Sequence, residues 1–288
     1  MANDPSLENL RQEIDRIDDE IHDLLMRRTE IVGQIGALKR QNEPAIVAMR
    51  PGREAQILRR LVGRHSGQFP IEVLVRIWRE LLSAQVSVQG DFSIGVFVPD
   101  GTSDYRDMAR DQFGSSTPLK TYQAVSQVVH EVWSGNISIG ILPFPVGERA
   151  DPWWRTLAVS AGPSPKIIAR LPFVLTRRAN TNERSALAIA MIEPESTGDD
   201  ISLVAIERLS DVSRDRLRAE MNERKLFADW LAVWHDPESP GYGLHLVSID
   251  GYLAAGDARL TEFRLRAGEA VGRTVVLGSY ARPIDAAA

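Results

Sequence analysis

The first forty residues constrain the fold most strongly, because apolar side chains recur there at steps of three and four. They are Leu7, Leu10, Ile14, Ile17, Ile21, Leu24, Leu25, Ile31, Ile35 and Leu38. This spacing predicts one helix over residues 6–40 with Ser6 as its N-cap. Such a helix is about 50 Å long at 1.5 Å per residue. A 90-residue domain cannot cover that stripe alone, so we expect a second copy of the chain to pack against it.

Two shorter helices are predicted after this long one. Asn42-Glu43-Pro44 ends the first pattern, and a second helical pattern runs from Pro51 or Gly52 to about residue 65. A break at residues 67–70 precedes a third pattern over residues 71–88. Residues 1–90 are therefore expected to form an all-α, three-helix domain.

After residue 90 the hydrophobic pattern is no longer purely helical. Strand-like runs alternate with helical ones over residues 91–199, which predicts an α/β domain. Residues 200–288 follow the order βαββαβ, the pattern of ferredoxin-like domains. The predicted architecture thus has three domains, with bounds at 1–90, 91–199 and 200–288.

Composition excludes several classes of function. The 288 residues include 34 Lys and Arg and 39 Asp and Glu, a net charge of -5, which argues against binding to nucleic acid or to an anionic membrane. There is no cysteine, so a disulfide framework, a thiolate metal site and a catalytic cysteine are ruled out. No export signal or membrane span is recognised, and we expect a cytoplasmic protein.

Some polar residues interrupt the helical patterns in a way that suggests anion binding. Arg28 stands where an apolar residue is due, and Lys39, 11 residues later, returns to nearly the same helix face. An inward arginine needs an anion, because an unpaired buried charge is very costly. The alternative is a solvated arginine on a helix surface. Arg53-Glu54 opens the second helix, and Gln85 lies near the end of the third.

With these residues in view, residues 7–89 resemble the all-helical chorismate mutases, in particular the first domain of bifunctional chorismate mutase/prephenate dehydratases. Six motif pieces agree in order and distance. They are Leu10-Arg11-x-x-Ile14, Ile17-Asp18-x-x-Ile21, Leu24-Leu25-x-x-Arg28, Gly36-x-x-Lys39, Arg50-Pro51-Gly52-Arg53-Glu54, and Ile77-Trp78-Arg79-Glu80 through Gln89.

The resemblance implies an isomerase that rearranges chorismate to prephenate in aromatic amino-acid biosynthesis, without a metal or an organic cofactor. It implies catalysis by holding the reactive conformer and by stabilising charge on the breaking ether oxygen. It also implies roles for individual residues: Arg11 and Arg28 pair the substrate carboxylates, Lys39 and Gln89 donate to the ether oxygen, Glu54 accepts the substrate hydroxyl, Arg53 orients Glu54, and Gln85 contacts a carboxylate.

Helix geometry adds a constraint on how this site is built. Arg11 and Arg28 are 17 residues apart, which is about 25 Å along a straight helix. No ligand of chorismate size spans that distance, so Arg11 must reach the site of a second protomer if both residues act. The intertwined homodimer of the family, with shared active sites, has that arrangement.

The two rear segments resemble the dehydratase and ACT domains of the same bifunctional proteins, but functional positions differ. The catalytic Thr-Arg-Phe of the dehydratase falls on Leu171-Pro172-Phe173, which predicts a degenerate, non-dehydratase remnant. The phenylalanine-contact pieces of the ACT domain are also replaced, which favours a structural role. Two alternatives stay open: a working bifunctional mutase/dehydratase, and a non-catalytic regulatory partner of an aromatic-pathway enzyme.

Overall fold

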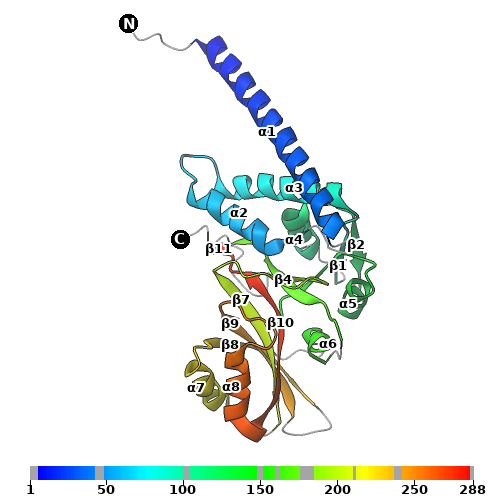
Figure 1. Cartoon of the computed structure of the whole chain (residues 1–288), viewed down its shortest axis with the longest axis vertical. Helices are drawn as coiled ribbons and strands as arrows, with labels where there is room; N and C mark the ends of the chain where they lie inside the picture. Colours follow the sequence, from blue (N-terminus) through cyan, green and yellow to red (C-terminus); the bar gives the residue numbers. More distant parts are fainter. Residues whose placement is uncertain are drawn as a thin grey trace. The chain divides into compact units, whose positions relative to one another are not determined.

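The computed structural model describes residues 6–42, 49–99, 104–147, 152–159, 162–175, 185–209, 212–236 and 242–285, with the side chains of 39–42 and 159 left out. The three predicted helices are confirmed as α1 (Leu7–Asn42), α2 (Pro51–Gly63) and α3 (Ile71–Gln89) (Figure 1). Ser6 caps α1 as expected, since its Oγ accepts a hydrogen bond from the Asn9 N–H at 3.2 Å.

A nine-stranded mixed sheet dominates the remainder, in the order β2-β1-β3-β6-β4-β10-β7-β9-β8. Its first part comprises β1 (Ile94–Phe97), β2 (Leu119–Tyr122), β3 (Ile139–Pro143), β4 (Lys166–Leu171) and β6 (Ala186–Ala190). The accompanying helices are α4 (Asp104–Phe113), α5 (Val125–Trp133) and α6 (Trp154–Val159). β1 pairs in parallel with both β2 and β3, which confirms an α/β segment.

The last part of the chain has the predicted βαββαβ order. Its elements are β7 (Asp200–Arg208), α7 (Arg214–Asn222), β8 (Ala228–His235), β9 (Gly243–Asp250), α8 (Ala258–Ala267), a short 3-10 turn (Gly268–Ala270) and β10 (Val271–Ala281). The antiparallel strands lie in the order β10-β7-β9-β8, as a ferredoxin-like sheet requires. Side chains of α7 and α8 pack with this sheet in one buried cluster that includes Leu217, Phe263 and Val247.

The two parts of the sheet join where β10 pairs with β4. Gly278 pairs with Ile167 in parallel, and its φ is +146°. A Cβ on Gly278 would lie 2.2 Å from the backbone oxygen of Ile167, so only glycine fits this approach. A small second sheet pairs β5 (Val174–Leu175) with β11 (Ile284–Asp285) in parallel.

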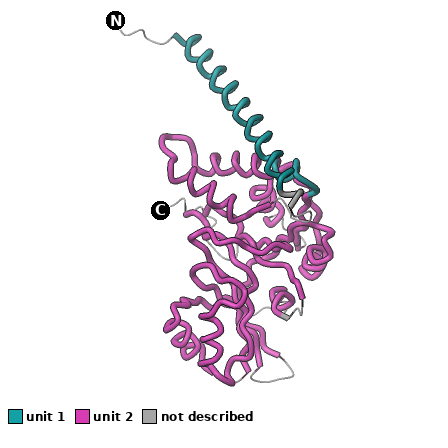
Figure 2. The backbone as a smooth tube through the Cα atoms, in the orientation of Figure 1, with its two compact units in different colours: residues 1–48, 85–91 teal, residues 49–84, 92–288 magenta. Residues whose placement is uncertain are grey.

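The chain divides into two compact units, coloured in Figure 2. One contains residues 1–48 and 85–91, and the other contains residues 49–84 and 92–288. α2 and most of α3 therefore group with the sheet, although the sequence places them in the helical domain. Part of their contact with it is apolar, since Ala55, Leu58 and Val75 share a buried cluster with Phe173. Among the helices of the described ranges, none has the length and hydropathy that a bilayer crossing requires.

Candidate active site

Arg28 carries the clearest sign of an anion site in the unit that contains α1. Its side chain is half-buried, and its Nη1 is buried with no hydrogen-bond partner among the described residues. Burial lowers the pKa of Arg28 from its ordinary value. The Arg28 guanidinium is thus partly withdrawn from solvent in the single chain. Its neighbour Arg27 is exposed.

Gln85 and Gln89 belong to the same unit and lie one helical turn apart at the end of α3. Gln85 is 5% exposed, and its Nε2 is buried without a partner in the described part of the chain. Gln89 is half-buried, and its Nε2 donates to the backbone carbonyl of Gln85 at 3.0 Å. A buried amide N–H that donates to nothing costs about 1–3 kcal/mol, so an acceptor brought by a ligand or by water would stabilise the Gln85 side chain.

The two remaining candidates on α1 are Arg11 and Lys39. Arg11 is exposed on the first third of the helix. Lys39 lies within α1, but its side chain is outside the described residues. α1 is continuous from Leu7 to Asn42, which supports the estimate of about 25 Å between Arg11 and Arg28 along the helix.

The other compact unit holds the carboxylate of the predicted site. Glu54 lies in the first turn of α2, and its Oε2 accepts a hydrogen bond from Arg79 Nη1 at 3.0 Å. Both side chains are buried, with 13% and 4% exposed. Burial raises the pKa of Glu54, and the positive charge of Arg79 opposes that rise. Arg53, the preceding residue, is exposed.

Arg79 is the residue whose role the sequence analysis missed. It stands at helical spacing between two inward positions, four residues after Val75 and three before Leu82. An arginine on an apolar stripe needs a carboxylate, by the same argument that singled out Arg28. The position of Arg79 in the sequence therefore indicates a buried partner, but it does not identify Glu54 as that partner.

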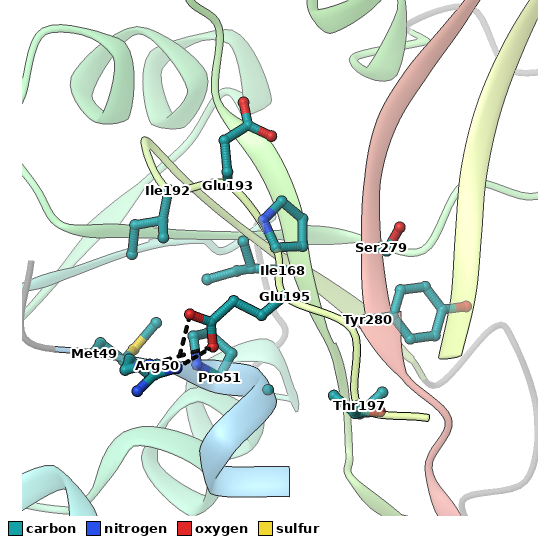
Figure 3. Close-up of a pocket in the computed structure, with 13 residues that line it drawn as sticks. Met49, Arg50, Pro51, Ile168, Ile192, Glu193, Glu195, Thr197, Ser279 and Tyr280 are labelled. Atoms are coloured by element: carbon teal, nitrogen blue, oxygen red, sulfur yellow. Dashed lines mark hydrogen bonds and ion pairs between the residues drawn. The ribbon is translucent and has the colours of Figure 1, made fainter. Parts of the chain in front are cut away.

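The start of α2 is fixed to the segment before β7. Figure 3 shows the Arg50 guanidinium paired with the Glu195 carboxylate, with Nη2 2.8 Å from Oε2. Arg59, further along α2, donates to Thr197 Oγ1 at 2.9 Å and to the backbone oxygens of Asp199 and Arg282 at 2.6 and 2.9 Å. The cavity beside Arg50, Glu195 and Thr197 has a volume of about 40 Å³, which has room for water and is far smaller than a substrate pocket.

A larger cavity of about 340 Å³ lies in the α/β part, at the carboxyl ends of β1 and β3. Its wall is mostly apolar and includes the aromatic side chains of Phe97, Phe144 and Trp153. None of the described residues that line it is charged. The described ranges also hold no group of three or more His, Asp or Glu side chains arranged to bind a metal ion.

Comparison with known proteins finds a family model that matches the helical part of the chain. Residues 10–90 match the model of chorismate mutase type II. Two bifunctional chorismate mutase/prephenate dehydratases are similar. The protein from Stutzerimonas stutzeri is 28% identical over 146 residues, which is 50% of this chain and 40% of that protein. The protein from Aquifex aeolicus is 33% identical over 142 residues, 48% of this chain and 38% of that protein. The chain thus spans about two fifths of the length of these relatives.

Solved structures resemble the chain in fold. A protein described as GqqA, a quorum-quenching acylase, superposes with a TM-score of 0.50 at 11% identity, over 67% of this chain and 96% of that one. Prephenate dehydratase from Streptococcus mutans gives a TM-score of 0.47 at 12% identity, over 67% and 99%. The first likeness shows a shared fold for about two thirds of the chain. Residues 10–90, which contain the motifs that carry Arg28, Glu54 and Gln89, are similar to the chorismate mutase type II family.

Proposed function

We propose that this protein rearranges chorismate to prephenate. One observation carries the proposal: within the segment that matches the mutase family, Arg28 Nη1 and Gln85 Nε2 are buried donors for which the described residues supply no acceptor. Buried donors that fold without a partner are satisfied by a ligand or by water. Chorismate, a dianion with two carboxylates, supplies acceptors of the required charge, and guanidinium groups favour carboxylates through paired hydrogen bonds.

The chemistry needs little from the protein besides geometry and charge. Arg28 and Arg11 would hold the two carboxylates and thereby fix the conformer in which the new carbon–carbon bond forms. Lys39 and Gln89 would donate to the ether oxygen as its bond breaks, where negative charge develops. Gln89 would have to share or exchange its present bond to the Gln85 carbonyl. Glu54 would accept the substrate hydroxyl, and Arg53 would orient it.

We further propose a homodimer with shared active sites. In the single chain the apolar stripe of α1 is exposed along its whole length, with 65% of Leu7, 57% of Ile14, 51% of Ile21 and 60% of Leu38 accessible. A continuous exposed stripe of this kind marks an association surface. Two antiparallel copies of α1 would cover each other and bring Arg11 of one protomer to Arg28 and Lys39 of its partner.

A working dehydratase is the less favoured alternative. The positions that correspond to the catalytic Thr-Arg-Phe are Leu171, which is fully buried, Pro172, and Phe173, which packs against α2 and α3. These side chains serve packing. The described residues that line the cavity in this part include no cation to pair with a dianion such as prephenate.

A non-catalytic regulatory role is the alternative from a different class. It gains support from the degenerate rear segments. It does not by itself explain why the buried donors of Arg28 and Gln85 both lie within the segment that matches the mutase family. A cytoplasmic location, as expected from the sequence, belongs to this proposal as well.

The test is to incubate the purified full chain with chorismate, without added metal or cofactor, and to identify the product. Prephenate formed well above the uncatalysed rate supports the mutase. Phenylpyruvate formed from prephenate at neutral pH, faster than without protein, would establish the bifunctional alternative. No conversion of chorismate would reject both enzymatic functions and leave the regulatory partner.

A further inference from the structure

The buried pair of Glu54 and Arg79 connects α2 to α3. Arg79 is 3% exposed, and its Nη1 lies 3.0 Å from Glu54 Oε2. This bond uses one oxygen of the Glu54 carboxylate, and 13% of that side chain stays accessible. An ionised carboxylate has about four lone-pair sites, so it keeps acceptor capacity for a substrate hydroxyl. The pair therefore does not exhaust the group that the proposed mechanism needs.

Phe173, which lies in the segment that resembles the dehydratase, contacts Arg79 of this pair. The guanidinium carbon Cζ of Arg79 lies 5.1 Å from the ring centroid of Phe173, within the range of a cation–π contact. Phe173 is 6% exposed and belongs to the same buried cluster as Ala55, Leu58 and Val75. Ala55 adjoins Glu54 in sequence, so the ring of Phe173 packs against the same turn of α2 that carries the carboxylate.

From these contacts we propose that Arg79 is a positioning residue for Glu54, and that Phe173 fixes Arg79 in turn. The inference rests on the proposed mutase function. It also gives the degenerate segment a role, because Phe173, at a position that aligns with the dehydratase motif, now supports a carboxylate of the mutase site. The mutase activity would then depend on the sheet-containing part of the chain.

The charge of Arg79 should affect the pH dependence of activity, whereas a contact that only packs against Glu54 should not. Burial raises the pKa of Glu54, and Arg79 is the charged residue that lowers it again. Without the positive charge, Glu54 stays protonated to a higher pH. A protonated carboxyl is a weaker acceptor for the substrate hydroxyl, so the acid side of the activity profile should move to higher pH. A lysine at position 79 keeps the charge and should leave the profile in place.

The experiment compares kcat and KM for chorismate, over a range of pH, in the full-length wild type and in Arg79→Gln and Arg79→Lys. We expect Arg79→Gln to lose about 100-fold in kcat/KM, as for a misplaced catalytic group. The acid limb of its pH–activity profile should move to higher pH. Arg79→Lys should retain more activity and the wild-type limb. An Arg79→Gln protein with wild-type kcat/KM and pH profile would overturn the inference, and so would equal shifts in both variants.

Phe173→Leu tests the second contact without burying a new charge. Phe144→Leu is its matched control, because Phe144 is 4% exposed and belongs to a different core cluster. Its ring centroid lies 4.8 Å from the Cζ of Arg170, so it also makes a contact with an arginine. Phe173→Leu should lower mutase kcat/KM more than Phe144→Leu, with both proteins folded by circular dichroism. Equal activities in the two variants would contradict the role of Phe173. An inactive wild type would instead reject the mutase function itself.

Discussion

The Arg50 guanidinium and the Glu195 carboxylate lie 2.8 Å apart and connect the start of α2 to the segment before β7. The pair is half-exposed, with 49% and 51% of the two side chains accessible. Nine residues further along α2, Arg59 makes three hydrogen bonds to the same region and to Arg282. α2 is thus held to the sheet-containing part by contacts that differ in their exposure to water.

This difference predicts unequal contributions to stability. Arg50→Ala should lower the free energy of unfolding by no more than about 1 kcal/mol, because exposed ion pairs are screened by solvent. Arg59→Ala should cost more, about 2–3 kcal/mol, because it removes three hydrogen bonds, two of which are partly buried. The Asp199 carbonyl keeps the Thr197 hydroxyl and the Arg282 N–H as donors, but Thr197 Oγ1 and the Arg282 carbonyl lose the Arg59 guanidinium. Urea denaturation of the two variants checks the order. A larger loss for Arg50→Ala would contradict it.

The shared site predicts that two inactive variants complement each other. Arg11→Ala and Lys39→Ala should each be poorly active as homodimers. After subunit exchange, each heterodimer has one site with both lesions and one site with neither, so random mixing should restore about a quarter of wild-type mutase activity. If the mixture stays as inactive as its parts after exchange has been verified, the shared-site dimer is wrong.

His245 predicts a pH dependence of stability. It is 2% exposed on β9, and neither ring nitrogen has a hydrogen-bond partner in the described structure. Burial and the nearby Arg208, Arg214 and His235 lower its pKa from 6.5 to about 4. The unfolded chain therefore takes up a proton as pH falls below 6.5, whereas the folded chain does not until about pH 4. The free energy of unfolding should fall over this window by up to about 3 kcal/mol.

Urea denaturation at pH 7 and pH 4.5 measures that slope, and His245→Leu should flatten it. His22→Gln is the control, since His22 lies on α1 with 69% of its side chain exposed. An unchanged slope in His245→Leu would show that other groups cause the pH dependence.

The elements that the sequence predicted well are those with strong local periodicity. α1 shows ten apolar positions at helical spacing, and its observed ends lie within two residues of the predicted ones. The ferredoxin-like part alternates clearly between strands and helices, and all six of its major elements were recognised. In both cases the signal lies within the segment itself.

Two strands of the nine-stranded sheet were not predicted, because their sequences lack the pattern typical of strands. β6 reads Ala186-Leu187-Ala188-Ile189-Ala190 and is fully buried between β3 and β4, although alanine favours helices. β2 is a four-residue edge strand with only Tyr122 buried. Tertiary pairing decides both, and a single sequence does not display it.

In the candidate site, too, features with a local pattern were predicted and features set by tertiary contacts were not. Arg28 and Gln85 were singled out from their helical positions, and both hold buried donors. The contact of Arg79 with Glu54 joins residues 25 positions apart, and the contact with Phe173 spans a further 94 positions. Nothing local specifies such pairs, and the grouping of α2 with the sheet was missed for the same reason.

The most direct test of the central claim is the turnover of chorismate by Arg28→Ala, measured beside Arg27→Ala and the wild type. Arg27 is the matched control, since it is adjacent in sequence and exposed. We expect kcat/KM to fall about 100- to 1000-fold in Arg28→Ala, as when a donor to developing charge is removed, and to stay near wild type in Arg27→Ala. Similar rates in all three proteins, or no turnover by the wild type, would contradict the account.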